Sequence, residues 1–212
     1  MNGCSLTVLA KAPLPGWAKT RLIPALGPDG AARLAERLLD HTLSEATASG
    51  LSPLRLLGSP DASHPALARH ANVAELGTQC AGDLGARMHQ ALCDGLAAQP
   101  AALVIGTDAP QLDRHRLREA ALALQSHDAV LVPALDGGYA LLGLRRPATD
   151  TSSPVPLAPL ALFTNMTWST ATVAHETRLR LRQLGLRWAE LTPVTDIDEP
   201  ADLAHLPAGW LA

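Results

Sequence analysis

The sequence predicts a three-layer α/β/α sandwich built around a mixed, mostly parallel β-sheet. Short apolar runs alternate along the chain with longer segments whose apolar residues recur at helical spacing, as is typical of α/β proteins. The run Leu103–Ile105 is apolar at every position, which is expected of a strand covered on both faces. The segment Asp136-Gly137-Gly138 joins two further strand-like runs, and this favours a hairpin with one antiparallel pair.

The individual elements follow in order from the same periodicity. Six apolar runs are expected to form strands, at residues 6–10, 54–57, 103–106, 129–133, 139–144 and 186–191. Helical spacing predicts helices around residues 31–42, 84–98, 117–124 and 169–183. Asp113 and Ser169 are predicted to cap the last two helices at their N-termini, and Gly185 is predicted to end the last one.

Length and composition limit the class of protein. The chain has 212 residues, of which 47% are hydrophobic, so residues 1–212 are expected to form one domain with a full core. The Pro-rich segment 145–160 is expected to be an irregular excursion over a site rather than a linker between domains. The formal net charge of −3 argues against nucleic acid as a partner.

The cysteines and the N-terminus indicate a compartment. Three widely spaced cysteines form no Cys-x-x-Cys pair, so neither a zinc ribbon nor a redox pair is predicted. No leader segment and no apolar run of membrane length can be recognised in the sequence. We therefore expect a cytoplasmic protein without a membrane partner.

The first loop carries the clearest chemical signal. Lys11, Lys19 and Arg21 follow the first predicted strand, where α/β proteins hold phosphate groups. The glycines of a Walker loop are missing, and Pro13 and Pro15 lack the N–H groups that such a loop needs. Side-chain cations are therefore expected to bind the phosphates, and a merely solvated basic loop is the alternative.

Two acidic segments are candidates for a metal site. Asp108 follows the predicted central strand, where a carboxylate suits a divalent metal bound to a diphosphate. A helix cap is the alternative role for Asp108, but Asp113 already fits that role. Asp196 and Asp198 point to one side of an extended segment, and Asp198 is equally suited to cap a helix that begins near Pro200.

Two glycine turns allow the backbone to approach a ligand closely. The first comprises Gly82, Asp83 and Gly85, and Arg87 lies one helical turn further on, where it could face the same ligand. The second is the Asp136-Gly137-Gly138-Tyr139 turn. Each is weak by itself, because ordinary turns use the same residues.

Six motifs occur in an order that is familiar from one family. They read Lys11-x-Pro-x-x-Gly-x-x-Lys-Thr-Arg-Leu22, Gly82-Asp-Leu-Gly-x-Arg-Met88, Gly106-Thr-Asp-x-Pro110, Pro133-x-x-Asp-Gly-Gly-Tyr139, Trp168-Ser-Thr170 and Asp196-Ile-Asp-x-Pro200. From about Leu6 to Leu206 the chain resembles the radical-SAM/selenodomain-associated transferase family, a bacterial group with the nucleotide-diphospho-sugar transferase fold. More distantly it is similar to the sugar-nucleotide and cofactor nucleotidyltransferases.

This resemblance implies a GT-A-type fold and assigns roles to several residues. The first loop, with Lys11, Gly16, Lys19 and Arg21, would bind the phosphates of a nucleotide. Asp108 would carry Mg²⁺ or Mn²⁺. The second metal ligand would be Asp198, the better match by position, or Asp196 as its substitute. The turn from Asp136 to Tyr139 would form the acceptor side.

The implied activity is that of a metal-dependent transferase in which Lys19, Arg21 and Asp108 are catalytic. Its partners would be a nucleoside triphosphate or a nucleotide sugar, together with an unknown small-molecule acceptor. Glycosyltransferases of this fold often carry Asp-x-Asp, whereas here Gly106 takes the first place. This favours a nucleotidyltransferase style of metal site and leaves glycosyl transfer open. A nucleotide or sugar-nucleotide sensor without catalytic activity is the alternative function.

Overall fold

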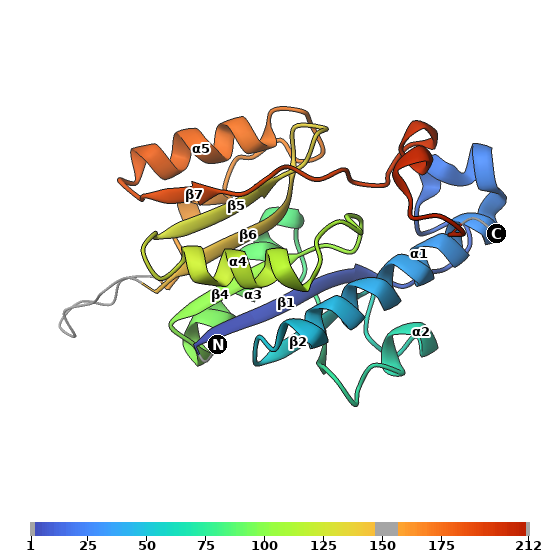
Figure 1. Cartoon of the computed structure of the whole chain (residues 1–212), viewed down its shortest axis with the longest axis horizontal. Coiled ribbons are helices and arrows are strands. Elements are labelled where there is room, and N and C mark those ends of the chain that lie inside the picture. Colours follow the sequence, from blue (N-terminus) through green and yellow to red (C-terminus); the bar gives the residue numbers. More distant parts are fainter. Residues whose placement is uncertain (1–2, 147–156, 211–212) are drawn as a thin grey trace.

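The structure, a computed structural model, describes residues 3–146 and 157–210 and confirms the predicted α/β architecture (Figure 1). Seven strands form one sheet in the order β3-β2-β1-β4-β6-β5-β7. Their bounds are β1 Cys4–Lys11, β2 Leu54–Ser59, β3 Glu75–Thr78, β4 Ala101–Ile105, β5 Ala129–Pro133, β6 Tyr139–Arg145 and β7 Trp188–Glu190. Only β6 runs antiparallel to its neighbours β4 and β5, so the sheet is mixed and mostly parallel.

Five α-helices and three short 3-10 helices connect the described strands. The α-helices are α1 Ile23–Ser49, α2 Pro65–Ala68, α3 Leu84–Ala98, α4 Arg114–Ala123 and α5 Val173–Gln183. The 3-10 helices are η1 Thr20–Leu22, η2 Leu160–Leu162 and η3 Pro200–His205. The long helix α1 is interrupted at Gly27, whose φ of 69° is not helical, and the helix resumes at Pro28, which suits a first turn.

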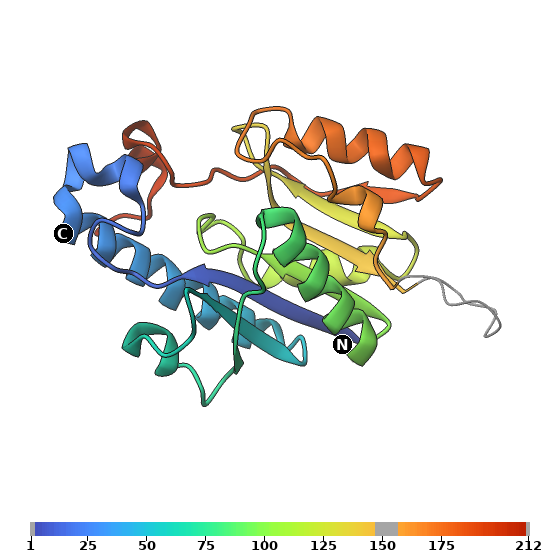
Figure 2. The same ribbon diagram turned by 180° about the vertical axis from the view of Figure 1, so that it is seen from behind.

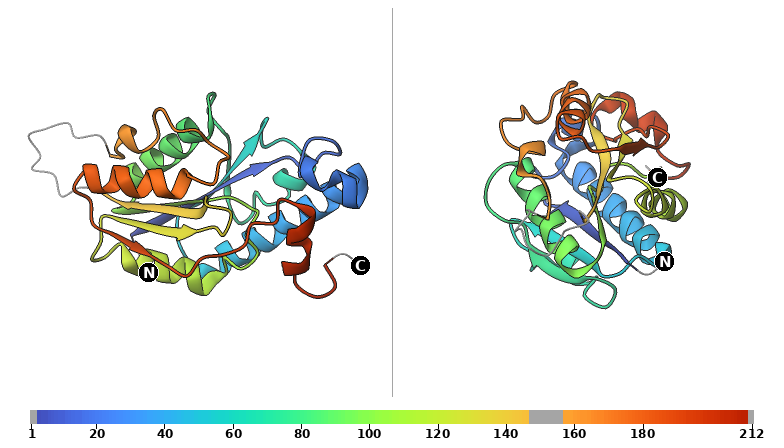
Figure 3. Two further views of the ribbon diagram at one scale, coloured as in Figure 1. Left: turned by 90° about the horizontal axis from the view of Figure 1, so that it is seen from above. Right: turned by 90° about the vertical axis from the view of Figure 1, so that its left-hand side faces the viewer.

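The helices cover both faces of the sheet, and two hydrophobic cores result. Residues of α1 and α4 pack on one face, against Leu6, Val8 and Leu103 among others. Residues of α3, α5 and η2 pack on the other face, against Val104 and Leu142. Figures 2 and 3 show the two layers from behind and from above, with α3 and α4 on opposite sides of the sheet. Burial on both faces explains why β4 is apolar at every position.

The strand directions bring several loops to one edge of the sheet. Strands β1, β4 and β5 all end at this edge, and the antiparallel β6 begins there. The chain after β7 passes along the same edge, because Val194 pairs with Ala134 and the amide of Ile197 donates to the carbonyl of Asp108 at 2.8 Å. The loops after β1, β4, β5 and β7 therefore converge.

Several sequence predictions differ from the structure. Ser169 does not cap α5, since Thr172 precedes the helix and Ser169 lies outside it with a φ of 61°. Asp198 does not cap η3, because Glu199 takes that position and forms a capping box with Asp202. In both cases the predicted cap lies N-terminal to the residue that directly precedes the helix. Most of the predicted excursion 145–160 lies outside the described residues.

Candidate functional site

A cleft of about 780 Å³ opens at the edge of the sheet where these loops converge. Its floor includes the last residues of β1 and β4 and the first residues of β6. Its walls come from the loop after β1, the start of α3, the Asp136 turn, the segment 168–171 and the segment 196–199. A volume of this size is ample for a nucleotide.

Lys19 lies at the centre of the charged end of the cleft. Its ammonium nitrogen Nζ is 2.6 Å from Oδ1 of Asp108 and 3.0 Å from Oδ1 of Asp198. It also donates to the backbone carbonyl of Ile197 at 2.6 Å, and the side chain is only 6% exposed. Burial alone would lower the pKa of Lys19, but the two carboxylates outweigh burial and hold the pKa above its usual value. The amine is therefore charged at neutral pH.

The surroundings of Asp196 disfavour its charged form, whereas those of Lys19 favour its charged form. The Oδ1 atom of Asp196 is buried and has no hydrogen-bond partner among the described residues. Burial raises the pKa of Asp196 to about 7, and three neighbouring carboxylates add to the rise. These are Asp108, Asp136 and Asp198. The environment of Asp196 thus disfavours its negative charge, at the end of the cleft where Lys19 is already engaged.

The Asp136 turn forms one wall of the cleft, with Gly138 and Tyr139 also lining it. Asp136 Oδ1 accepts a hydrogen bond from the Gly138 amide at 2.8 Å, which fixes the turn. Gly137 has a φ of 93°, and a Cβ atom there would collide with the backbone of Ala171. The glycine is therefore required by packing against the segment before α5.

Arg87 and Trp168 form the other end of the cleft. Arg87 Nη1 lies 3.4 Å from Oε1 of Gln79, whose amide nitrogen donates to backbone carbonyls of β1 and β2. Arg87 Nε and Trp168 Nε1 are both buried and have no partner among the described residues. A Cβ atom at Gly85 would lie 2.7 Å from Cζ2 of Trp168, so Gly85 allows the indole to pack on α3. In the sequence, Trp168 appears only within a motif, and no pattern indicates that Gln79 belongs to a site.

The remaining predicted residues divide into two groups. Lys11 and Arg21 line the cleft, and Arg21 is 59% exposed and 3.8 Å from Asp198. Among the described residues that line the cleft, five predicted site residues are absent: Gly16, Gly82, Asp83, Gly85 and Gly137. Asp83 instead caps α3, where its side chain accepts from the Ala86 amide. The ligand roles of both groups stay predictions.

The carboxylates fit a metal ion that is shared with a ligand. Among the described residues, no group of three or more His, Cys, Asp and Glu side chains is arranged to hold a metal ion by itself. Mg²⁺ commonly takes only one or two protein carboxylates and completes its shell with phosphates and water. Asp108 and the unpartnered oxygen of Asp196 offer such a partial set.

Comparison with known proteins places the chain in a family. A family model described as "Uncharacterized protein conserved in bacteria (DUF2064)" matches residues 42–170, which is more than half of the chain. The chain belongs to the DUF2064 family. In the comparison with curated proteins, nothing matches the sequence. No helix in the described part of this DUF2064 protein is long and apolar enough to cross a membrane.

Solved structures share the fold of this DUF2064 protein. A protein from Desulfovibrio desulfuricans G20 named "putative nucleotide-diphospho-sugar transferase" is 26% identical, with a TM-score of 0.81 over 94% of this chain and 84% of that one. A nucleotidyl transferase from Methanothermobacter is 12% identical, with a TM-score of 0.66 over 100% and 99% of the two chains. Rv0371c from Mycobacterium tuberculosis in complex with manganese is 16% identical, with a TM-score of 0.54 over 97% and 98%. The sheet and its helices thus match the nucleotide-diphospho-sugar transferase superfamily.

Proposed function

We propose that this protein is a metal-dependent transferase that acts on a nucleotide substrate in the cleft. One observation carries the proposal. Four buried side-chain atoms lack a hydrogen-bond partner in the described part of the chain, and three of them belong to cleft-lining residues: Arg87, Trp168 and Asp196. Native proteins rarely leave such atoms unpaired, so an unmet demand concentrated in one cleft points to a ligand there. The names of the similar structures support a nucleotide as that ligand.

The residues suggest a division of roles within the cleft. Asp108 would hold the metal ion together with Asp198, the better match of the resemblance, and Asp196 would offer its unpartnered oxygen at the same end of the cleft. The exposed guanidinium of Arg21 and the amine of Lys11 would bind phosphate oxygens. When bound, the metal would neutralise charge on the leaving phosphate group. Manganese in the Mycobacterium tuberculosis structure supports this assignment of a divalent ion.

The rest of the cleft would hold the other parts of the reactants. Arg87 and Gln79 lie beside the apolar side chains of Met88 and Leu84, which suits a flat base or a sugar. The Asp136 turn would face the acceptor. Nucleotidyl transfer and glycosyl transfer need the same metal and phosphate contacts, so both chemistries stay within the proposal. The association with radical-SAM proteins stays a prediction from the resemblance.

A thermal-shift panel tests the proposal. The four nucleoside triphosphates and a set of UDP- and GDP-sugars are each added with Mg²⁺, with Mn²⁺ and without metal. At least one nucleotide should raise the melting temperature, and the metal should enlarge the rise, because a ligand that binds only the folded state stabilises it by mass action. If no nucleotide stabilises the wild-type protein, the proposed function is overturned.

The variant Asp108→Asn tests whether the nucleotide binds at the proposed site. We expect it to weaken binding of the metal–nucleotide pair at least tenfold, because the amide is a poor substitute for a carboxylate at a divalent ion. Asp113→Asn is the matched control, since it also removes a charge after β4 but keeps the cap of α4. Equal losses in both variants would contradict the assigned role of Asp108.

Product analysis separates the chemistries. The stabilising nucleotide is incubated with a small-molecule extract as the source of acceptor. Release of pyrophosphate identifies nucleotidyl transfer, and release of a nucleoside diphosphate identifies glycosyl transfer. Binding without either product, in the presence of every acceptor extract, would favour the sensor function instead.

A further inference from the structure

The ammonium group of Lys19 has no free hydrogen bond to offer a ligand. A lysine amine carries three N–H donors. In this structure three oxygen atoms surround it within 3.0 Å, one each from Asp108, Asp198 and the Ile197 carbonyl. The residue that the sequence predicts to bind phosphate is therefore engaged with the carboxylates that were predicted to bind metal.

The surroundings of this ammonium group are those of a cation site. Two carboxylate oxygens and a backbone carbonyl oxygen are the donor types that Mg²⁺ and Mn²⁺ prefer. The Lys19 side chain is only 6% exposed, whereas the side chains of Asp108 and Asp198 are each 43% exposed and are open to the cleft. The site is also assembled from three separate places in the chain, the first loop, the end of β4 and the C-terminal segment.

The backbone holds Lys19 in an unusual conformation to reach this position. Its φ of 49° and ψ of 42° lie in the left-handed region, which residues other than glycine seldom adopt. The residue directly precedes η1, and its carbonyl accepts from the Leu22 amide at 2.9 Å. The loop geometry thus places the amine between the two carboxylates rather than toward open solvent.

We propose that Lys19 is a resident counter-cation that lies between Asp108 and Asp198 at the proposed metal position, so that the divalent ion enters together with the nucleotide. This inference rests on the proposed function and specifies its substrate as the metal–nucleotide complex. The phosphates of the nucleotide offer the ammonium group new acceptors, and the released carboxylates then accept the metal. Metal and nucleotide should therefore strengthen the binding of each other, as linkage requires.

The alternative arrangement would be a metal site that is ready before the nucleotide arrives. The contacts of Lys19 argue against it, because its amine already lies within 3.0 Å of both Asp108 and Asp198. A metal ion alone would have to displace a charged, fully hydrogen-bonded amine. Weak binding of free Mn²⁺ to the wild-type protein is the direct consequence.

Calorimetric titration with Mn²⁺ alone tests the proposal without any nucleotide. Lys19→Met removes the amine and leaves both carboxylates, so it should bind Mn²⁺ at least tenfold more tightly than the wild-type protein. Arg182→Met is the control, because it removes an exposed cation of α5 that does not line the cleft and forms no ion pair with a described carboxylate. It should change the Mn²⁺ affinity less than twofold.

Unpaired carboxylates could prevent Lys19→Met from folding, and a circular-dichroism melt shows whether they do. If Lys19→Met does not fold, Lys19→Gln replaces it in the Mn²⁺ titration, since its neutral amide still donates hydrogen bonds to the carboxylates. Its affinity for Mn²⁺ should lie between those of the wild-type protein and the expected value for Lys19→Met.

The outcomes separate this inference from the proposed function. Unchanged Mn²⁺ affinity in the Lys19 variants, or an equal gain in Arg182→Met, overturns the counter-cation role even if nucleotides bind. If no nucleotide stabilises the wild-type protein while Lys19→Met gains Mn²⁺ affinity, the counter-cation role holds and the nucleotide substrate is wrong. If nucleotides stabilise the wild-type protein equally with and without Mn²⁺, the coupled entry of metal and nucleotide is wrong.

Discussion

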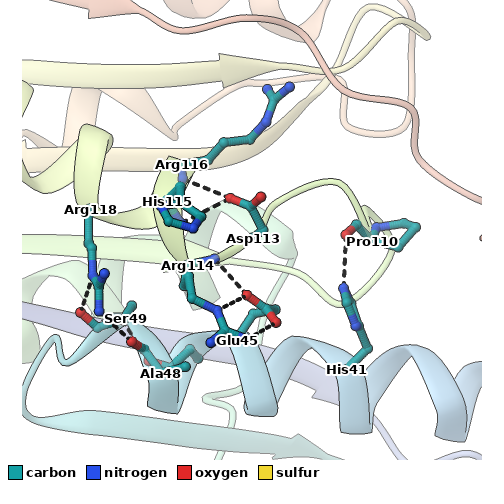
Figure 4. Close-up of polar contacts among 11 residues, drawn as sticks. His41, Glu45, Ala48, Ser49, Pro110, Asp113, Arg114, His115, Arg116 and Arg118 are labelled. Carbon is teal, nitrogen blue, oxygen red and sulfur yellow. Dashed lines mark hydrogen bonds and ion pairs between the residues drawn. The ribbon is translucent and has the colours of Figure 1, made fainter.

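Two regions of the molecule are built from similar charged and polar side chains, but these side chains are well paired in one region and incompletely paired in the other. We call the first the α1–α4 clasp, formed by His41 and Glu45 of α1 with Pro110, Arg114 and Arg118 (Figure 4). Glu45 accepts three hydrogen bonds from Arg114, from the amide, Nε and Nη2 at 2.9, 2.8 and 2.7 Å. Arg118 donates to two carbonyls at the end of α1, and His41 reaches the Pro110 carbonyl at 2.9 Å.

The cleft is the second region, and its polar groups are incompletely paired. Asp196, Arg87 and Trp168 each carry a buried atom without a partner among the described residues. The contrast suggests that the clasp contributes to stability, whereas the cleft gives up stability for binding. The clasp also supports the cleft, because Pro110 belongs to the loop that carries Asp108.

Breaking the clasp should produce the largest effect on stability. Glu45→Ala is expected to lower the free energy of unfolding by about 2 to 3 kcal/mol, because Glu45 is 12% exposed and its bonds to Arg114 are charge-assisted. For a chain of this size the melting temperature should fall by about 6 °C. Nucleotide affinity of the folded protein should change less than twofold. Glu119→Ala, at an exposed position of α4, the helix that carries Arg114, is the control and should change stability by less than about 0.5 kcal/mol.

The pH dependence of the same pair checks the cause of this effect. The hydrogen bonds from Arg114 lower the pKa of Glu45 from 4.5 to about 2. A depressed carboxyl pKa stabilises the folded state fully above pH 4.5, and this stabilisation is lost as the pH falls toward 2. The stability difference between wild type and Glu45→Ala should therefore shrink between pH 4.5 and pH 2. A constant difference over this range would show that lost packing, rather than the ion pair, causes the destabilisation.

Removing a carboxylate from the cleft should stabilise the protein, whereas breaking the clasp should destabilise it. At pH 8, Asp196→Asn is expected to raise the free energy of unfolding by about 1 to 2 kcal/mol, because above its raised pKa of about 7 Asp196 is a half-buried charge that is repelled by three carboxylates. Binding of the metal–nucleotide pair should become at least tenfold weaker. Chemical denaturation and the thermal-shift panel measure the two effects separately.

Asp136→Asn gives a matched comparison, since Asp136 is exposed and its side chain already accepts from the Gly138 amide. Its stability gain should be clearly smaller. If Asp196→Asn destabilises the protein, the carboxylate has a structural partner and the contrast between clasp and cleft fails.

Much of the fold could be predicted from local pattern alone. Strand β5 has the bounds of the apolar run at 129–133, and α3 has those of the helical pattern at 84–98. Asp113 caps α4 as expected. Strand β3 was missed, because this edge strand is only partly buried and contains a glycine. The first turns of α1 were also missed, since Gly27 and Pro28 are typical of a loop.

The site could be predicted only in part. Rules about strand ends identify Lys11 and Asp108 as neighbours of one edge of the sheet. Sequence gives no distance between Lys19, Asp108 and Asp198, so it could not show that the predicted phosphate ligand pairs with the predicted metal ligands. Sequence also could not show that the folded chain pairs Asp198 with Lys19 and leaves an oxygen of Asp196 without a partner among the described residues.

Adding a small group to the floor of the cleft should have the smallest effect on stability. Gly106 follows β4 and lines the cleft, and a Cβ atom there would meet nothing within 4 Å. Its φ does not lie in the left-handed region, so Gly106→Ala should leave the melting temperature within about 1 °C of the wild-type value. The space over Gly106 is available to a ligand, and the added methyl group should therefore weaken nucleotide binding about tenfold. The larger Gly106→Leu should weaken it further at similar stability. Unchanged affinity in both variants would show that the nucleotide does not approach the end of β4.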